Sequence, residues 1–175
     1  MASLAEARIG TTHNQYCRSR LRRARLRAYL ESRADASFIL VGEAAGYRGA
    51  RVSGVPFTSE RQLTGAGPAE ASATIVHRVL AELGLDAQVL LWNVVPTHPG
   101  TERSNRRPTR AEVDASLAFL RELVPGRRTV AAGRLAQSVL GCPYVRHPSH
   151  GGASEFRAGL LSFAAGAREV RRFSV

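Results

Sequence analysis

The sequence predicts an α/β protein with a parallel sheet that has helices on both faces. Four short apolar runs are typical of buried strands, at residues 38–41, 89–92, 129–132 and 143–145. The segments between them place apolar residues at helical spacing, and strands that alternate with helices build parallel sheets. The chain has 175 residues, which suits one domain with a substantial core, and no repeat or linker divides it. We therefore expect a single domain over residues 1–175.

A first helix is expected over residues 14–34. Four residues recur at helical spacing on one face of it: Cys17, Leu21, Ala24 and Ala28. Six Arg lie between residues 18 and 27 and are spread around the helix axis. A solvated face is the simpler interpretation of these arginines, and a surface that contacts phosphate groups is the alternative.

The first strand, 38–41, leads into a glycine-rich loop at 42–54 and a further loop that reaches residue 60. Gly67-Pro68 is expected to begin the next helix, because proline is tolerated in a first turn. Gly84 ends this helix. Its apolar stripe is formed by Ile75, Val76, Val79, Leu80 and Leu83.

The second strand, 89–92, precedes a long polar loop at 96–108 that holds three Pro and three Arg. Thr109 and Glu112 have the spacing of a capping box, which predicts the start of a helix. Pro125-Gly126 ends it. Its apolar face is formed by Val113, Leu117, Leu120 and Val124.

The last part of the chain repeats the alternation of strand and helix. After the third strand, 129–132, Gly133 turns into a short apolar helix. The fourth strand, 143–145, and a final helix over residues 153–164 complete the predicted elements.

The formal net charge of +11 is large for a chain of this length, and all 25 basic residues are Arg. Codon usage in a GC-rich genome is the simplest reason for Arg in place of Lys, but it does not explain the excess of positive charge. Such an excess favours a polyanionic partner, because basic side chains bind phosphates and release counterions. We expect nucleic acid, with acidic proteins or membrane surfaces as the alternatives.

The sequence disfavours several other classes of protein. No apolar run approaches the roughly 18 residues of a membrane span, and residues 1–10 lack a signal-peptide core. Cys17 and Cys142 are too few for a disulfide framework or a four-cysteine metal site. No cluster has metal-ligand spacing, and the elbow motif of serine hydrolases is absent from the sequence. We expect a cytoplasmic monomer that needs no metal or cofactor and binds no membrane.

Polar turns follow several of the predicted strands. Gly42-Glu43-Ala44-Ala45-Gly46 comes after the first strand, Asn93 ends the second, and His147-Pro148-Ser149 follows the fourth. In a parallel sheet the carboxyl ends of the strands share one edge, and ligands bind there. The sequence therefore predicts one pocket that contains a carboxylate, an amide and an imidazole.

These side chains suit the recognition of a base. The Asn93 amide offers a donor and an acceptor, which can read the edge of an amide-like base. The His147 imidazole can stabilise developing negative charge, and Phe57 can stack on a base. A structural turn Asn, a structural His and a core Phe are the respective alternatives.

Other polar residues have simpler interpretations. The turn at Glu43 can instead bind phosphate or be merely structural, although it lacks the spacing of a nucleotide fingerprint and the chain has no Lys for a P-loop. His98 is expected to be a loop residue, and His13 and His77 have no evident partner.

In this order, the motifs resemble those of the uracil-DNA glycosylase superfamily. Gly42-Glu43-Ala44-Ala45-Gly46 is similar to its first motif, and Phe57 to the aromatic residue that stacks on the flipped base. Asn93 matches the Asn that reads the uracil edge, and His147-Pro148-Ser149 matches the His-Pro-Ser motif. The resemblance extends from about residue 38 to residue 160. It implies a three-layer αβα sandwich around a four-stranded, largely parallel sheet.

The resemblance also implies roles for individual residues. His147 would support the leaving uracil anion, and Glu43, or Glu60 as the second choice, would orient the water or counter the positive charge on the sugar. The residues expected to bind the base are Gly42, Ala44, Tyr47, Phe57 and Asn93. The residues expected to contact DNA are Arg48, Arg51, Ser149, His150 and Gly151.

The chain departs from the family at several points. Efficient members carry an Asp at the position of Ala44, and Ala45 stands where proline is usual. The iron–sulfur branch needs four cysteines, whereas this chain has two, so no cluster is expected. An apolar wedge often follows the His-Pro-Ser motif, whereas His150-Gly151-Gly152 follows it here.

The function expected from the sequence is that of a monofunctional DNA glycosylase in base excision repair. It would remove uracil, or another damaged base, from single- or double-stranded DNA after the base has been flipped into the pocket. One alternative is a DNA damage-binding protein of the same fold with weak or no catalysis. The other is an N-glycosidase that acts on a free nucleoside or nucleotide.

Overall fold

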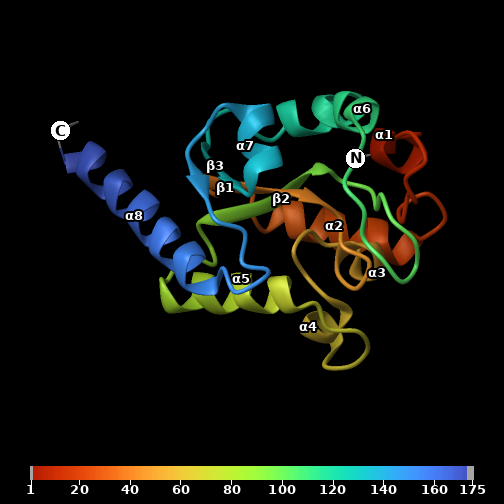
Figure 1. Ribbon diagram of the computed structural model, residues 1–175, viewed down its shortest axis with the longest axis horizontal. Helices are drawn as coiled ribbons and strands as arrows, with labels where there is room; N and C mark the ends of the chain where they lie inside the picture. Colours follow the sequence, from red (N-terminus) through yellow and green to blue (C-terminus); the bar gives the residue numbers. More distant parts are fainter. Residues whose placement is uncertain (1, 173–175) are drawn as a thin grey trace.

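The computed structural model describes residues 2–172 and has the predicted α/β architecture (Figure 1). Its sheet consists of four parallel strands in the order β2-β1-β3-β4. Their bounds are Phe38–Ala44 for β1, Val89–Val95 for β2, Arg128–Ala132 for β3 and Tyr144–Val145 for β4. The predicted strands are thus confirmed, and β1 and β2 continue through the polar residues at their ends.

Helices cover both faces of the sheet, which confirms the three-layer arrangement. On one face, Phe38 and Leu40 pack against α5 (Ala71–Glu82) and α8 (Ala153–Arg172). On the other face, Ile39 and Val41 belong to the cluster formed with α2 (Arg20–Glu31), α6 (Arg110–Arg121) and α7 (Arg134–Leu140). Alternate residues of β1 are therefore buried on opposite sides, as expected for the central strand of a sandwich.

The first long helix differs from its prediction in both its start and its buried face. α2 begins at Arg20, after a short helix α1 (Ala2–Glu6), and its N-cap Ser19 accepts a hydrogen bond from Arg22 N. The predicted apolar face is exposed, with Leu21 at 58% exposure, and Leu26 is the buried residue instead. The cause is that the inward face of α2 also carries arginines, which a pattern of apolar residues does not reveal.

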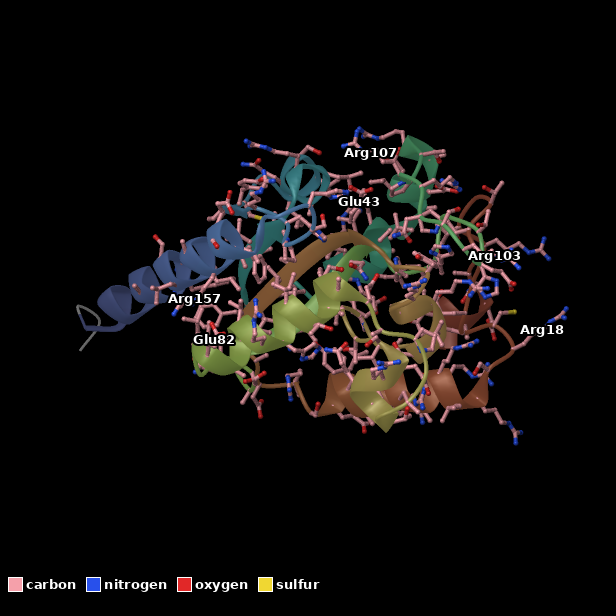
Figure 2. All side chains as sticks on the ribbon, turned by 60° about the horizontal axis from the view of Figure 1, so that its bottom comes forward. Arg18, Glu43, Glu82, Arg103, Arg107 and Arg157 are labelled. Atoms are coloured by element: carbon pink, nitrogen blue, oxygen red, sulfur yellow. The ribbon has the colours of Figure 1, made fainter. Side chains whose placement is uncertain are left out.

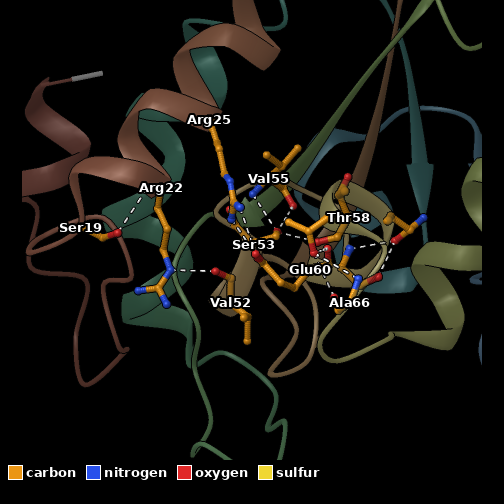
Figure 3. A network of polar contacts seen from close by, with 12 residues as sticks. Ser19, Arg22, Arg25, Val52, Ser53, Val55, Thr58, Glu60 and Ala66 are labelled. Atoms are coloured by element: carbon orange, nitrogen blue, oxygen red, sulfur yellow. Dashed lines mark hydrogen bonds and ion pairs between the residues drawn. The ribbon is translucent and has the colours of Figure 1, made fainter.

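These arginines fix the segment between β1 and α5 (Figure 3). Arg22 Nε donates to Val52 O at 2.8 Å. Arg25 forms a two-pronged ion pair with Glu60 at 2.8 and 2.9 Å and donates to Ser53 O. Because the side chains of Arg25 and Glu60 are only 20% and 22% exposed, this pair is a partly buried anchor.

The segment that was predicted to be loop contains two short helices, α3 (Ala50–Ser53) and α4 (Glu60–Thr64). Gly67-Pro68 does not begin α5, which starts at Ala71. Instead, Pro68 O accepts a hydrogen bond from Arg61 N, so it closes the turn after α4.

α8 continues past the predicted end at residue 164 and runs beyond the sheet (Figure 1), in line with the high helix propensity of its alanines. Among the described residues, no helix is both long and apolar enough to cross a membrane.

The predicted capping box at Thr109 and Glu112 is present, and Glu112 does more than cap α6. Its carboxylate is 2% exposed and accepts hydrogen bonds from Thr109 N, Thr11 N and both terminal nitrogens of Arg106. Hydrogen bonds from Arg106 hold the pKa of Glu112 at about 2. The N-terminal segment, the 96–108 loop and α6 therefore meet at one buried charge.

We predict that Glu112→Gln lowers the free energy of unfolding by about 3 kcal/mol at pH 7, since it removes a charged partner from several donors. The ordinary pKa of Glu is 4.5, and the folded-state pKa of Glu112 is about 2. The stabilisation is therefore complete above pH 4.5 and is lost as the pH falls toward 2. Urea unfolding of both proteins between pH 7 and pH 3 measures this difference.

The matched control is Asp114→Asn on the same helix, where an exposed ion pair with Arg110 is removed. It should change the free energy of unfolding by less than about 0.5 kcal/mol. A Glu112→Gln protein as stable as the control variant at pH 7 would contradict the assignment.

Candidate active site

A cavity of about 560 Å³ opens at the carboxyl ends of the strands. Residues expected at the site line it from several segments: Glu43, Ala44, Phe57, Asn93, His147, Ser149 and His150. The carboxylate, the amide and the imidazole predicted from separate strand ends are thus brought together. The parallel pairing of the strands causes this, because it aligns their carboxyl ends along one edge.

Close packing between Gly42, Asn93 and Phe57 forms one side of the cavity. Gly42 and Asn93 are paired in register between β1 and β2. A Cβ at position 42 would lie 2.8 Å from the Phe57 ring atom Cε2 and 2.9 Å from Asn93 Oδ1. Gly42 is not among the residues that line the cavity, but its lack of a side chain lets both Phe57 and Asn93 pack closely against it.

Phe57 is held in a strained backbone conformation. Its φ angle is +51°, in the left-handed region that a bulky residue rarely adopts. The hydroxyl of Thr58 donates to Pro56 O at 3.0 Å, so the contact of 3.1 Å with His77 Nε2 requires His77 to be the donor. Ser53 Oγ donates to Thr58 O at 2.6 Å. The residues on either side of Phe57 are thus fixed. His77, for which the sequence suggested no partner, contributes by its hydrogen bond to Thr58.

His98 joins two loops next to the cavity. It is fully buried, and its ring nitrogens lie 2.7 Å from Ala45 O and 2.7 Å from Thr101 O. The side chain therefore connects the turn after β1 with the 96–108 loop. The sequence placed His98 correctly in a loop but gave no sign of this contact.

Glu43 is half-buried at the end of β1. Burial raises its pKa above the ordinary value, and the nearby Arg107 partly opposes this effect. Figure 2 shows Glu43 and Arg107 at the same edge of the molecule. Glu43 is therefore an acid inside the cavity whose charge is partly balanced from the 96–108 loop.

His147 is held by the backbone and side chain of Ser149. Ser149 N donates to His147 Nδ1 at 3.2 Å, and the Ser149 hydroxyl lies 2.8 Å from the same nitrogen. Burial lowers the pKa of His147, and the neighbouring His150 acts in the same direction. Because Nδ1 accepts a hydrogen bond, the neutral ring carries its proton on Nε2, which remains available to a ligand.

Several residues expected to bind substrate or DNA do not line the cavity. Tyr47 N donates to Asn105 Oδ1, and the Arg48 guanidinium lies 5.4 Å from the centre of the Tyr47 ring. The Arg51 side chain is 15% exposed and forms an ion pair with Glu102 at 2.7 Å. Gly151 is exposed beside the His-Pro-Ser turn.

Glu60, the second choice for a catalytic carboxylate, lies outside the cavity. Both of its oxygens bind Arg25, and this ion pair between α2 and α4 occupies the carboxylate. The sequence could not reveal this pair, since its members are far apart along the chain.

The cavity also contains charged residues that the sequence did not identify as site residues. Glu70 lines it, as do Arg106, Arg107, Arg134 and Arg146. The Arg134 guanidinium lies 4.3 Å from the centre of the Tyr144 ring. The three Arg of the 96–108 loop were visible as a cluster, but Glu70 belongs to no motif. Among residues 2–172, no group of His, Cys, Asp and Glu is arranged to hold a metal ion.

Comparisons with known proteins agree with this architecture. The family model of the uracil DNA glycosylase superfamily matches residues 30–165, which is most of the chain. The fold is similar to the crystal structure of wild-type SMUG2 from Pedobacter heparinus, with a TM-score of 0.69 over 97% of this chain and 96% of that chain. The two sequences are 12% identical, so this likeness concerns the fold alone. No curated protein matches this chain significantly in sequence.

We predict that His147 is neutral at pH 7, carries its proton on Nε2 and has a pKa below the ordinary 6.5, because burial disfavours the imidazolium. Ring ¹⁵N chemical shifts measured by NMR between pH 4.5 and pH 8 test all these statements, and His147→Ala assigns the signal. A signal that titrates above pH 6.5, or a ring protonated on Nδ1 at pH 7, would refute the prediction.

Proposed function

This chain belongs to the uracil DNA glycosylase superfamily, and we propose that it hydrolyses the N-glycosidic bond of a flipped, damaged base in DNA, with uracil as the first candidate. The observation that carries the proposal is the cavity that Asn93, His147 and Phe57 line together. It contains a group to read a base, a group to stabilise its anion and a ring to stack on it. The product would be an abasic site, as in base excision repair.

Base recognition would depend on Asn93 and Phe57. Asn93 is 4% exposed, and its amide can pair with one carbonyl and one ring N–H of the base. Phe57 is 7% exposed and is fixed by the bonds around Thr58, so it offers a rigid face for stacking. A rigid pair of this kind discriminates between bases, since a base with the wrong edge leaves buried polar groups unpaired.

Bond cleavage would depend on His147. As the C1′–N bond breaks, its electron pair moves to the base, and positive charge develops on the sugar. The Nε2–H of a neutral His147 donates to the oxygen of the base that gains this charge. Glu43 would orient the water or counter the charge on the sugar. The water then adds to C1′ and loses a proton, which gives the abasic sugar and the free base.

DNA would be held by arginines around the cavity. Arg134 and Arg146 line it from the segments that follow β3 and β4. Other arginines, such as Arg18 and Arg103, lie on surfaces away from Glu43 (Figure 2). Positive charge at the mouth of the cavity suits a phosphate backbone on either side of a flipped nucleotide.

A damage-binding protein with weak or no catalysis is the second candidate. It is favoured by Ala44, which lines the cavity and has no acidic group. Its prediction is tight binding of damaged DNA with no release of a base.

The central test is base release from labelled single- and double-stranded oligonucleotides that contain one uracil, hypoxanthine or xanthine, followed by alkaline cleavage at abasic sites. We expect a cleaved product, and we expect Asn93→Ala and His147→Ala each to reduce its rate about 100-fold, because each removes a group that acts on the base. Their affinity for the intact DNA should change far less.

The control for this test is His13→Ala, since His13 lies outside the cavity and its exposed side chain should leave the rate unchanged. If the two cavity variants released the base at the parent rate, the proposed mechanism would be wrong. If the parent protein bound the DNA tightly but released no base, the second candidate would be favoured.

Arg134→Ala should weaken binding to all the oligonucleotides alike. It should also reduce the slope of log Kd against log salt concentration by about 1, as expected for one lost phosphate contact. Arg157→Ala is the control, because Arg157 pairs with Glu82 at 3.1 Å and does not line the cavity; Figure 2 shows this pair away from Glu43. Fluorescence anisotropy at several salt concentrations gives both slopes, and equal slopes for the two variants would argue against Arg134 as a DNA contact.

A further inference from the structure

Glu70 is a carboxyl group in the cavity that has no hydrogen-bond or ion-pair partner among the described residues. It is the N-cap residue of α5, but its side chain does not cap the helix. Instead, it lines the cavity together with Glu43 and His147. Within residues 2–172, no side chain or backbone N–H donates a hydrogen bond to its carboxylate, and no arginine pairs with it. Glu70 is partly buried, and a partly buried acid without a partner is costly, so it is unusual unless a ligand or water completes it.

Two glycines make room for the Glu70 carboxylate. Oε1 occupies the space that a side chain at Gly46 would need, and Oε2 occupies the corresponding space at Gly49. The carboxylate therefore lies across the turn that follows β1. This turn begins directly after Glu43, Ala44 and Ala45, so Glu70 is placed beside the first motif although it comes from another part of the chain.

Two other acids near this end of the sheet are already engaged. Glu60 is bound by Arg25, and Glu112 accepts hydrogen bonds from five donor atoms. Glu43 is in the cavity, with Arg107 close enough to affect its titration. Glu70 is thus the acid of the cavity that has, among the described residues, neither a hydrogen-bond partner nor an arginine close enough to affect its titration, so its oxygens are free to bind a water molecule.

The titration of Glu70 is governed by burial. Burial raises its pKa to about 7. Four arginines line the same cavity, Arg106, Arg107, Arg134 and Arg146, but none of them lies close enough to reverse the effect. The remaining titratable groups of the cavity are Glu43, Tyr144, His147 and His150. An acid of this kind is partly ionised at neutral pH and can accept a proton efficiently there.

We propose that Glu70 is a catalytic residue of this chain: its carboxylate binds the attacking water and takes a proton from it as the oxygen adds to C1′. The inference rests on the proposed function. The C1′–N bond breaks with its electron pair on the base, the O–C1′ bond forms, one O–H bond of the water breaks, and its proton moves to Glu70. The proton then passes to solvent or to the released base anion, which restores the carboxylate. Glu43 is left to counter the positive charge on the sugar.

The test is a pH profile of single-turnover base release, measured with the base that the parent protein removes fastest. The parent rate should rise through an apparent pKa near 7 and then level off, since Glu70 must be ionised to act. Glu70→Gln should lower the plateau about 100-fold and abolish this rise. Glu70→Asp keeps an acid at a shorter reach, so it should retain the rise with a reduced plateau. A change of rate with pH that is caused by the titration of His147 would lie below pH 6.5 and would remain in both variants.

Glu82→Gln is the matched control, because Glu82 is the last residue of the same helix and is exposed. Its profile should be that of the parent protein. Affinity for the intact oligonucleotide, measured for every variant, distinguishes a lost proton acceptor from a misfolded site. A rise near pH 7 that persists in Glu70→Gln, or a parent-like plateau in that variant, would overturn the role of Glu70 and leave the proposed function standing. Absence of base release by the parent protein would overturn both.

Discussion

The site depends on one close approach, in which Gly42 lies opposite Asn93 in the pairing of β1 with β2 and leaves space for the Phe57 ring. A side chain at position 42 would meet both partners. The approach places the amide and the ring on the same side of the cavity, and Phe57 adopts a φ of +51° in this arrangement. The bonds of Ser53, Thr58 and His77 hold that conformation, so the packing around Phe57 serves the geometry of the cavity.

The arginines of this protein act as scaffold as well as surface charge. Arg22 binds a backbone carbonyl, Arg25 binds Glu60, and Arg106 binds the buried Glu112. The planar guanidinium suits such sites, because it presents several donors in a fixed geometry. The net charge of +11 therefore overstates how many arginines are available to DNA, and those that line the cavity are the more informative group.

The parts of the structure that follow local rules could be predicted from the sequence. The strands, the capping box at Thr109 and Glu112, and the polar turns at the strand ends are local patterns, and parallel pairing is enough to bring the turns together. The buried face of α2 could not be predicted, because arginine stems and guanidinium groups replace apolar residues there. The positions of Glu60 and Glu70 could not be predicted either. Glu60 lies outside the cavity because it pairs with Arg25, and Glu70 lines the cavity because α5 starts beside it. Neither arrangement has a signature in the sequence.

Glu112 and Glu70 have the same side chain, and the fold treats them in opposite ways. Donors from several segments surround Glu112 and hold its pKa at about 2, whereas burial without donors raises the pKa of Glu70 to about 7. The first arrangement stabilises the fold, because the ionised form is better bound in the folded state than in water. The second stabilises nothing in the free protein, since a partly desolvated carboxylate without a partner disfavours folding at high pH. Gly46 and Gly49 nevertheless leave space for it beside the motif that ends β1. An acid that is kept at such a cost inside a cavity is better explained by the chemistry of the cavity than by the stability of the fold.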